Sequence, residues 1–178
     1  MGTDVIDLYL LHWPGSIPLD ETLSGFERLV QSGKIRHWGV SNFDIDLMSE
    51  LKVLDGGAAC ATNQVLYNIG VRGPEWDLLP WCQNNAVPLM AYSPLGQGEL
   101  LDHPALAEVA DRHGVTAAAI AIAWTLRVDG VISIPKSAEP VRIDENLQAI
   151  EVELSADDLA TLDDAFPAPV GPSPLHMI

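Results

Sequence analysis

The sequence is short of cysteine, of basic residues and of long apolar runs, and each shortage excludes a class of protein. Only Cys60 and Cys82 are present, so we expect no disulfide framework, no zinc or other metal site, and a reducing cytoplasm as the compartment. Lysine and arginine number 9 against 25 acidic residues, a formal net charge of −16, which argues against nucleic acid as a partner. No apolar run reaches the roughly 18 residues of a membrane helix. The N-terminus also lacks the basic start of a signal peptide.

Apolar runs alternate with helical segments along the chain. Hydrophobic residues make up 48% of the 178, enough for one domain with a core, and no linker divides the sequence. Strand-like runs are expected near residues 4–12, 35–41, 60–67, 87–93 and 130–135. Strand followed by helix, repeated about five times, predicts a parallel sheet, either open and doubly wound or part of a closed barrel. The Rossmann glycine pattern and the P-loop are absent from the sequence.

Short local signals predict where the helices begin and end. Gly33 ends the first helix, Thr116 caps the alanine-rich segment 117–127, and Ser155 with Asp158 forms a capping box for the closing helix. The remaining helices are expected to start at Asn42 or Asp44, at Pro74, and at Ser137 or Glu139–Pro140.

His12 ends the first apolar run, directly before Trp13 and Pro14. One interpretation is a core histidine whose ring is satisfied by a backbone carbonyl. The other is a hydrogen-bond donor or proton relay that faces a substrate carbonyl. The position at a strand tip favours the second interpretation, because (β/α) barrels carry their chemistry at the carboxyl ends of their strands.

Polar side chains also follow or lie on three later strand-like runs. Ser41 and Asn42 are either helix caps or groups that recognise an amide. Gln64 belongs either to a structural hydrogen-bond network or to a ligand site. Tyr92 either packs in the interior or stacks on a flat ring such as a nicotinamide. The residues alone leave these alternatives open.

Two of the few cations lie six residues apart. Lys136 and Arg142 flank Ser137, which is expected to open a helix. Cations beside a helix N-terminus form an anion site, most naturally for phosphate. The alternative is a solvated pair beside Glu139 and Asp144.

Several motifs, taken in order, resemble those of the aldo-keto reductase family. The motifs that resemble the family's fourth to eighth strands are DVIDLYLLHWP (4–14), GVSNF (39–43), NQV (63–65), AYSPLG (91–96) and IPKS (134–137). The ending FPAP (166–169) is similar to that of bacterial members that reduce small aldehydes such as methylglyoxal. The resemblance implies a partial (β/α)8 barrel of about five strands with their helices and a C-terminal helix, in a single domain over residues 1–178.

The resemblance also implies NADP(H) as the cofactor and a small carbonyl compound as the substrate. His12 would orient the carbonyl, and Trp13 would help to line the substrate pocket. The groups implied at the nicotinamide are Ser41, Asn42 and Gln64 on the carboxamide and Tyr92 stacked on the ring. The groups implied elsewhere are Ser93, Leu95 and Gly96 along the pyrophosphate, Lys136, Ser137 and Arg142 on the 2′-phosphate, and Glu145 and Asn146 against the adenine.

The resemblance begins at the family's fourth strand. The family's catalytic tyrosine, aspartate and lysine belong to the preceding segment, so His12 is the one tetrad member matched here. We therefore expect an N-terminally incomplete reductase domain that is inactive alone. Its open sheet edges would self-associate or pair with a complementing N-terminal half. The alternatives are an NADP-binding or interaction protein without catalysis, and a fragment that does not fold.

Overall fold

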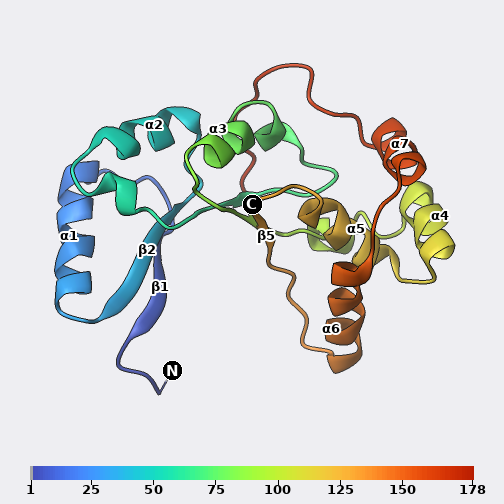
Figure 1. Cartoon of the computed structure of the whole chain (residues 1–178), viewed down its shortest axis with the longest axis horizontal. Helices are drawn as coiled ribbons and strands as arrows, with labels where there is room; N and C mark the ends of the chain where they lie inside the picture. The colour runs from blue at the N-terminus through green and yellow to red at the C-terminus, as the bar shows by residue number, and fades with distance from the viewer. Residues whose placement is uncertain (1) are drawn as a thin grey trace.

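The computed structural model describes residues 2–178, in which strands and helices alternate (Figure 1). The strands are β1 (Ile6–Leu11), β2 (Ile35–Ser41), β3 (Asn63–Leu66), β4 (Leu89–Tyr92) and β5 (Val131–Ser133). The α-helices are α1 (Leu19–Gln31), α2 (Ile45–Val53), α3 (Leu78–Asn84), α4 (Pro104–His113), α5 (Ala117–Leu126), α6 (Pro140–Leu147) and α7 (Ala156–Ala165). Short 3₁₀ turns are η1 (Gly57–Ala59), η2 (Gly73–Glu75), η3 (Gly96–Gly98) and η4 (Gln148–Glu151).

Within residues 2–178 the five strands form one parallel sheet whose order is the order along the chain. Every crossover therefore moves one place in the same direction, as in a barrel, whereas a doubly wound sheet reverses direction partway. The expected part of a (β/α)8 barrel is thus confirmed. The predicted run 35–41 coincides with β2, and the other four runs extend beyond the strands they contain.

Most of the predicted helix ends are confirmed. Gly33, with φ +69°, follows the end of α1. Of the two residues proposed to start α2, Asp44 is the cap, and its carboxylate accepts a hydrogen bond from a first-turn N–H. Thr116 caps α5, and Ser155 with Asp158 forms the capping box of α7. These polar side chains satisfy N–H groups that have no partner inside their own helix.

One helix start is not where the sequence predicts it, and of the two starts proposed for α6, Ser137 or Glu139–Pro140, the second is confirmed. Pro74 lies in the separate 3₁₀ turn η2, because Asp77, with φ −140° and ψ −46°, breaks the helical path before α3. Ser137 does not open a helix. Its hydroxyl accepts a hydrogen bond from the Glu139 N–H at 3.1 Å, and α6 begins at Pro140. The sequence signals also omit α4, whose buried stripe has only three residues.

The core lies where the helices pack on the sheet. Its largest fully buried side chains include Trp124, Tyr67, Phe43, Met48 and Leu51. Helix α5 contributes most completely, with seven of its ten residues buried. A helix that is apolar on all sides is stable only where neighbouring elements cover all of it.

The two ends of the sheet carry exposed apolar side chains. Within the described residues, β1 pairs only with β2 and β5 only with β4. Tyr9 on β1 is 45% exposed and Ile132 on β5 is 44% exposed. Ile143 and Leu147 on α6 are exposed as well.

No helix of residues 2–178 is both long and apolar enough to cross a membrane.

Candidate cofactor and active site

Four of the predicted site residues meet beside the carboxyl end of β2: Ser41 and Asn42 at that end, Gln64 within β3, and Tyr92 at the end of β4. The Ser41 hydroxyl donates to the Gln64 carbonyl at 2.8 Å. The Asn42 amide donates to the Ser41 hydroxyl at 3.2 Å and to the His12 carbonyl at 3.2 Å. The Tyr92 hydroxyl donates to the Asn42 Oδ1 at 3.3 Å, and burial raises the pKa of this phenol. One polar network therefore joins β3 to the tips of β1, β2 and β4.

Neither Ser41 nor Asn42 acts as a helix cap, so that interpretation was wrong for both. Asp44 caps α2 instead. Asn42 lies in the left-handed region, with φ +61°, a conformation that asparagine tolerates better than most residues. This backbone turn follows directly after β2 and keeps the amide beside its neighbours at the sheet edge.

His12 and Trp13 follow β1 and are exposed. Their rings stack with centroids 4.3 Å apart and planes 9° apart. The core-histidine interpretation is therefore wrong, because the side chain of His12 is not buried. Its imidazole lies at the same end of the sheet as the Ser41–Tyr92 network, to which it contributes its backbone carbonyl.

A cavity of about 580 Å³ is lined by seven of the other predicted residues. Those seven are Ser93, Leu95, Lys136, Ser137, Arg142, Glu145 and Asn146. The predicted residues that do not line it are His12, Trp13, Ser41, Asn42, Gln64, Tyr92 and Gly96. Tyr92 and Ser93 are adjacent in the chain, so the network at the strand tips continues into the cavity wall.

The charge of this cavity is positive on one side. Lys136 and Arg142 lie in its wall, and within residues 2–178 neither has a carboxylate oxygen within ion-pair distance. The first residues of α5, Ala117 and Ala118, also lie in the wall, so a helix N-terminus does face the cavity. It belongs to α5 and not to a helix opened by Ser137, which corrects the prediction. Cations and a helix N-terminus together favour an anionic ligand.

The loop after β4 forms another wall of the cavity. Four of its residues have left-handed backbones: Ser93 (φ +48°), Gly96 (+54°), Gln97 (+58°) and Gly98 (+97°). Gly96 does not line the cavity, and a Cβ there would lie 2.7 Å from the Leu100 side chain. Sequence reasoning missed the wall residues Gln97, Gly98, Leu101, Thr116, Ala117 and Ala118. The glycines at 96 and 98 are the signal in the sequence that marks this turn.

No group of three or more histidine, cysteine, aspartate or glutamate side chains of residues 2–178 is placed to hold an ion. Cys60 and Cys82 are free and buried.

Comparison with known proteins places the chain in a family. The model of the aldo/keto reductase family matches residues 1–166, and the chain belongs to that family. It is 49% identical over 183 residues to methylglyoxal reductase YeaE of Escherichia coli (strain K12), and the match covers 100% of this chain and 64% of that protein. It is 38% identical over 160 residues to a glyoxal reductase of Bacillus subtilis (strain 168), covering 90% of this chain and 56% of the relative.

Solved structures give the same result. An aldo/keto reductase from Klebsiella pneumoniae, crystallised with NADP and acetate, superposes with a TM-score of 0.96 at 45% identity. That match covers 99% of this chain and 64% of the crystallised one. The chain thus spans less than two thirds of the length of these relatives.

Proposed function

We propose that residues 1–178 bind NADP(H) and orient a small carbonyl substrate, as part of an aldo-keto reductase. The observation that supports this most directly is the cavity with Lys136 and Arg142 in one wall and the loop after β4 in another. Its volume, about 580 Å³, falls within the usual range of cofactor pockets. The crystallised relative from Klebsiella pneumoniae, described as a complex with NADP, also favours this ligand.

The cavity would hold the phosphate-rich part of the cofactor. Lys136, Ser137 and Arg142 would bind the 2′-phosphate, because two cations without carboxylate partners and a hydroxyl suit a dianion. The adenine would lie against Glu145 and Asn146. The residues proposed along the pyrophosphate are Ser93, Leu95 and Gly96, whose loop continues from Tyr92.

The network at the strand tips would receive the nicotinamide. The amides of Asn42 and Gln64 and the hydroxyl of Ser41 match the donor and acceptor of a carboxamide, and Tyr92 offers a flat face to the ring. When bound, the cofactor supplies a hydride. His12 would donate a hydrogen bond to the carbonyl oxygen and so fix which carbon faces the nicotinamide.

The substrate in this proposal is a small aldehyde or ketone such as methylglyoxal, the class named for the Escherichia coli relative. Trp13 would line the pocket beside His12, on which it stacks. A cytoplasmic location fits the two free thiols. The proton donor would come from a complementing N-terminal segment that pairs with β1 and β5. Self-association through these edges is the competing arrangement.

Cofactor titration tests the proposal. We expect the chain to bind NADPH more tightly than NADH. Arg142→Ala should weaken NADPH by about 1.5–3 kcal/mol, the scale of a lost charged hydrogen bond, and hardly change NADH. Arg36→Ala is the matched control, because Arg36 is exposed and pairs with Asp7 on β1. Equal losses for the two cofactors in a fluorescence titration would refute the 2′-phosphate assignment.

Non-catalytic cofactor binding is the second candidate function. The family's proton donor has no match in this chain, so NADPH oxidation with methylglyoxal should stay at background for residues 1–178 alone. General acid catalysis alone contributes about 10²–10⁴-fold. A turnover of about one per second, within the usual range for enzymes, would mean that another residue of this chain donates the proton.

A further inference from the structure

The loop between β3 and α3 holds a buried amide that the proposed mechanism does not use. Asn68 is 2% exposed, and its Oδ1 accepts hydrogen bonds from the N–H groups of Gly70 and Val71, each at 2.9 Å. Its Nδ2 donates to the carbonyl of Ser93 at 2.9 Å. One side chain therefore joins its own loop to the proposed pyrophosphate loop.

The carbonyl to which Asn68 donates also begins the first turn of that loop. The Ser93 carbonyl also accepts from the Gly96 N–H at 3.0 Å, which closes the turn 93–96. Ser93 and Gln97 have left-handed backbones without being glycine, a conformation that surrounding contacts must maintain. The bond from Asn68 is such a contact from outside the turn.

Packing brings the same two loops together a second time. A Cβ on Gly70 would lie 2.9 Å from one methyl group of Leu100, and a Cβ on Gly96 would lie 2.7 Å from the other. Leu100 therefore packs against both backbones at once, at the two positions where glycine leaves room. The hydrogen bond and this contact fix the spacing between the loops.

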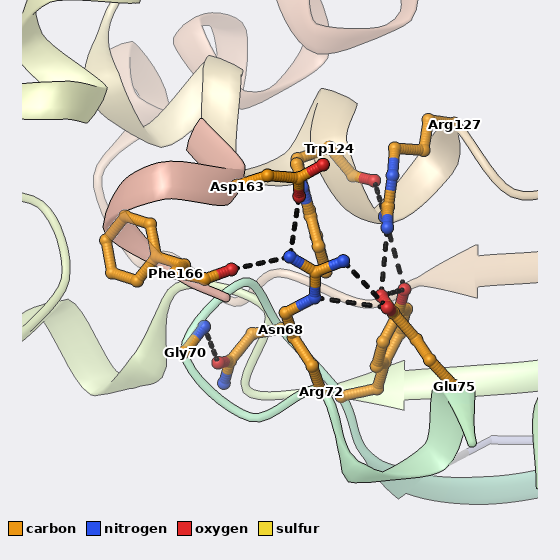
Figure 2. Close-up of polar contacts among 9 residues, drawn as sticks. Asn68, Gly70, Arg72, Glu75, Trp124, Arg127, Asp163 and Phe166 are labelled. Atoms are coloured by element: carbon orange, nitrogen blue, oxygen red, sulfur yellow. Dashed lines mark hydrogen bonds and ion pairs between the residues drawn. The ribbon is translucent and has the colours of Figure 1, made fainter. Parts of the chain in front are cut away.

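The far end of the β3 loop is anchored to other parts of the fold (Figure 2). Arg72 is 8% exposed and donates to the Asp163 carboxylate at 2.6 Å and to the Phe166 carbonyl at 2.5 Å. It also pairs with Glu75, which in turn pairs with Arg127 on the end of α5. The loop that carries Asn68 is thus joined to the ends of α5 and α7.

We propose that Asn68 is a positioning residue that sets the backbone of residues 93–98 for binding the cofactor pyrophosphate. This inference rests on the function proposed above and adds a residue to it. Asn68 itself does not line the cavity and acts through the Ser93 carbonyl. The proposed 2′-phosphate site is formed by Lys136 and Arg142, which Asn68 does not contact. Asn68 should therefore affect binding of the pyrophosphate and leave binding of the 2′-phosphate unchanged.

Asn68→Asp separates the two functions of the side chain, the acceptor for its own loop and the donor to the Ser93 carbonyl. The carboxylate keeps an acceptor for Gly70 and Val71 but replaces the donor to Ser93 with an oxygen. We expect NADPH affinity to fall by about tenfold or more, the scale of one lost buried hydrogen bond. Affinity for adenosine 2′-monophosphate, which has no pyrophosphate, should stay unchanged in calorimetry. Arg142→Ala should instead weaken both ligands.

Asn85→Asp is the matched control, because it removes an amide that donates to the Trp81 carbonyl at the end of α3, outside the cavity. Urea unfolding of each variant shows whether it folds, and Asn68→Ser replaces the aspartate variant if that one does not. Wild-type affinity for NADPH in the folded Asn68 variant, with Arg142→Ala still weakened, would overturn the inference alone. Parallel loss of both ligands would assign Asn68 a purely structural role and also overturn it. Binding of neither ligand by the wild type would overturn the proposed function itself.

Discussion

Glu75 should be a costly carboxylate to neutralise. Its Oε2 accepts from Arg72 at 2.8 and 3.1 Å, and its Oε1 accepts from Tyr67 at 2.8 Å and Arg127 at 2.9 Å (Figure 2). Burial alone would raise the pKa of Glu75, but the hydrogen bonds from these three side chains hold it below the ordinary value. Glu75→Gln keeps the shape and removes the charge.

The expected loss of unfolding free energy follows from the hydrogen bonds that remain in the variant. The carboxylate of Glu75 has two acceptor oxygens for two guanidinium groups and a phenol, whereas glutamine has only one. The NH2 group of the glutamine would replace the other oxygen and face a donor N–H or O–H. Removing one partner of a buried ion pair costs about 3–5 kcal/mol. Arg72 keeps Asp163, and Arg127 keeps the Trp124 carbonyl at 2.7 Å, so we expect about 3 kcal/mol. That is a large part of the roughly 5–15 kcal/mol that stabilises a typical domain.

Urea unfolding at pH 7, followed by far-ultraviolet circular dichroism, measures this loss. Asp7→Asn is the matched control, since it also converts a carboxylate to an amide, but in the exposed pair with Arg36, where the expected cost is about 0–1 kcal/mol. The reasoning is wrong if the two variants lose the same amount.

Two further predictions concern titratable groups elsewhere. Hydrogen bonds from Ser155 and His113 hold the pKa of Asp158 below its ordinary value of 3.8, so its contribution is fully present above that pH and is lost as the pH falls through the lower folded value. The difference in unfolding free energy between wild type and Asp158→Asn should therefore be constant from pH 5 to the ordinary pKa of Asp158 and shrink only in stronger acid. A difference that already shrinks at pH 5 would contradict this. Burial raises the pKa of Cys60 to about 11 and of Cys82 to about 12, so neither thiol should react with Ellman's reagent until the chain is unfolded in urea. Rapid labelling of the native chain would refute the burial of these thiols.

Much of the candidate site could be predicted because its residues lie on the strands or at their carboxyl ends. Ser41 and Tyr92 end β2 and β4, and Gln64 lies opposite Ser41 in the pairing of β2 with β3, so the three come together once the strand order is known. Lys136 and Arg142 stand out because cations are rare in this sequence. These two signals are local, and the fold then brings the groups together.

The supporting residues could not be predicted in the same way. Asn68 and Arg72 lie in a loop, and no spacing in the sequence indicates that their partners are Ser93 and Asp163. The sequence predicts a helix N-terminus at Ser137, next to Lys136, whereas the helix that faces the cavity is α5, which comes earlier in the chain. Contacts between distant segments depend on the whole path of the backbone, which local patterns do not contain.

The Arg72 contacts have a consequence for the order in which the chain folds. Each strand pairs with the strand that precedes or follows it in the sequence, so the sheet can grow by one strand at a time. Arg72 instead joins Asp163 and Phe166, which are 91 and 94 residues away. Long loops close more slowly and at a higher entropic cost than short ones. Helix α7 should therefore dock after the sheet has formed, and the loop that carries Asn68 should gain its final rigidity in that late step.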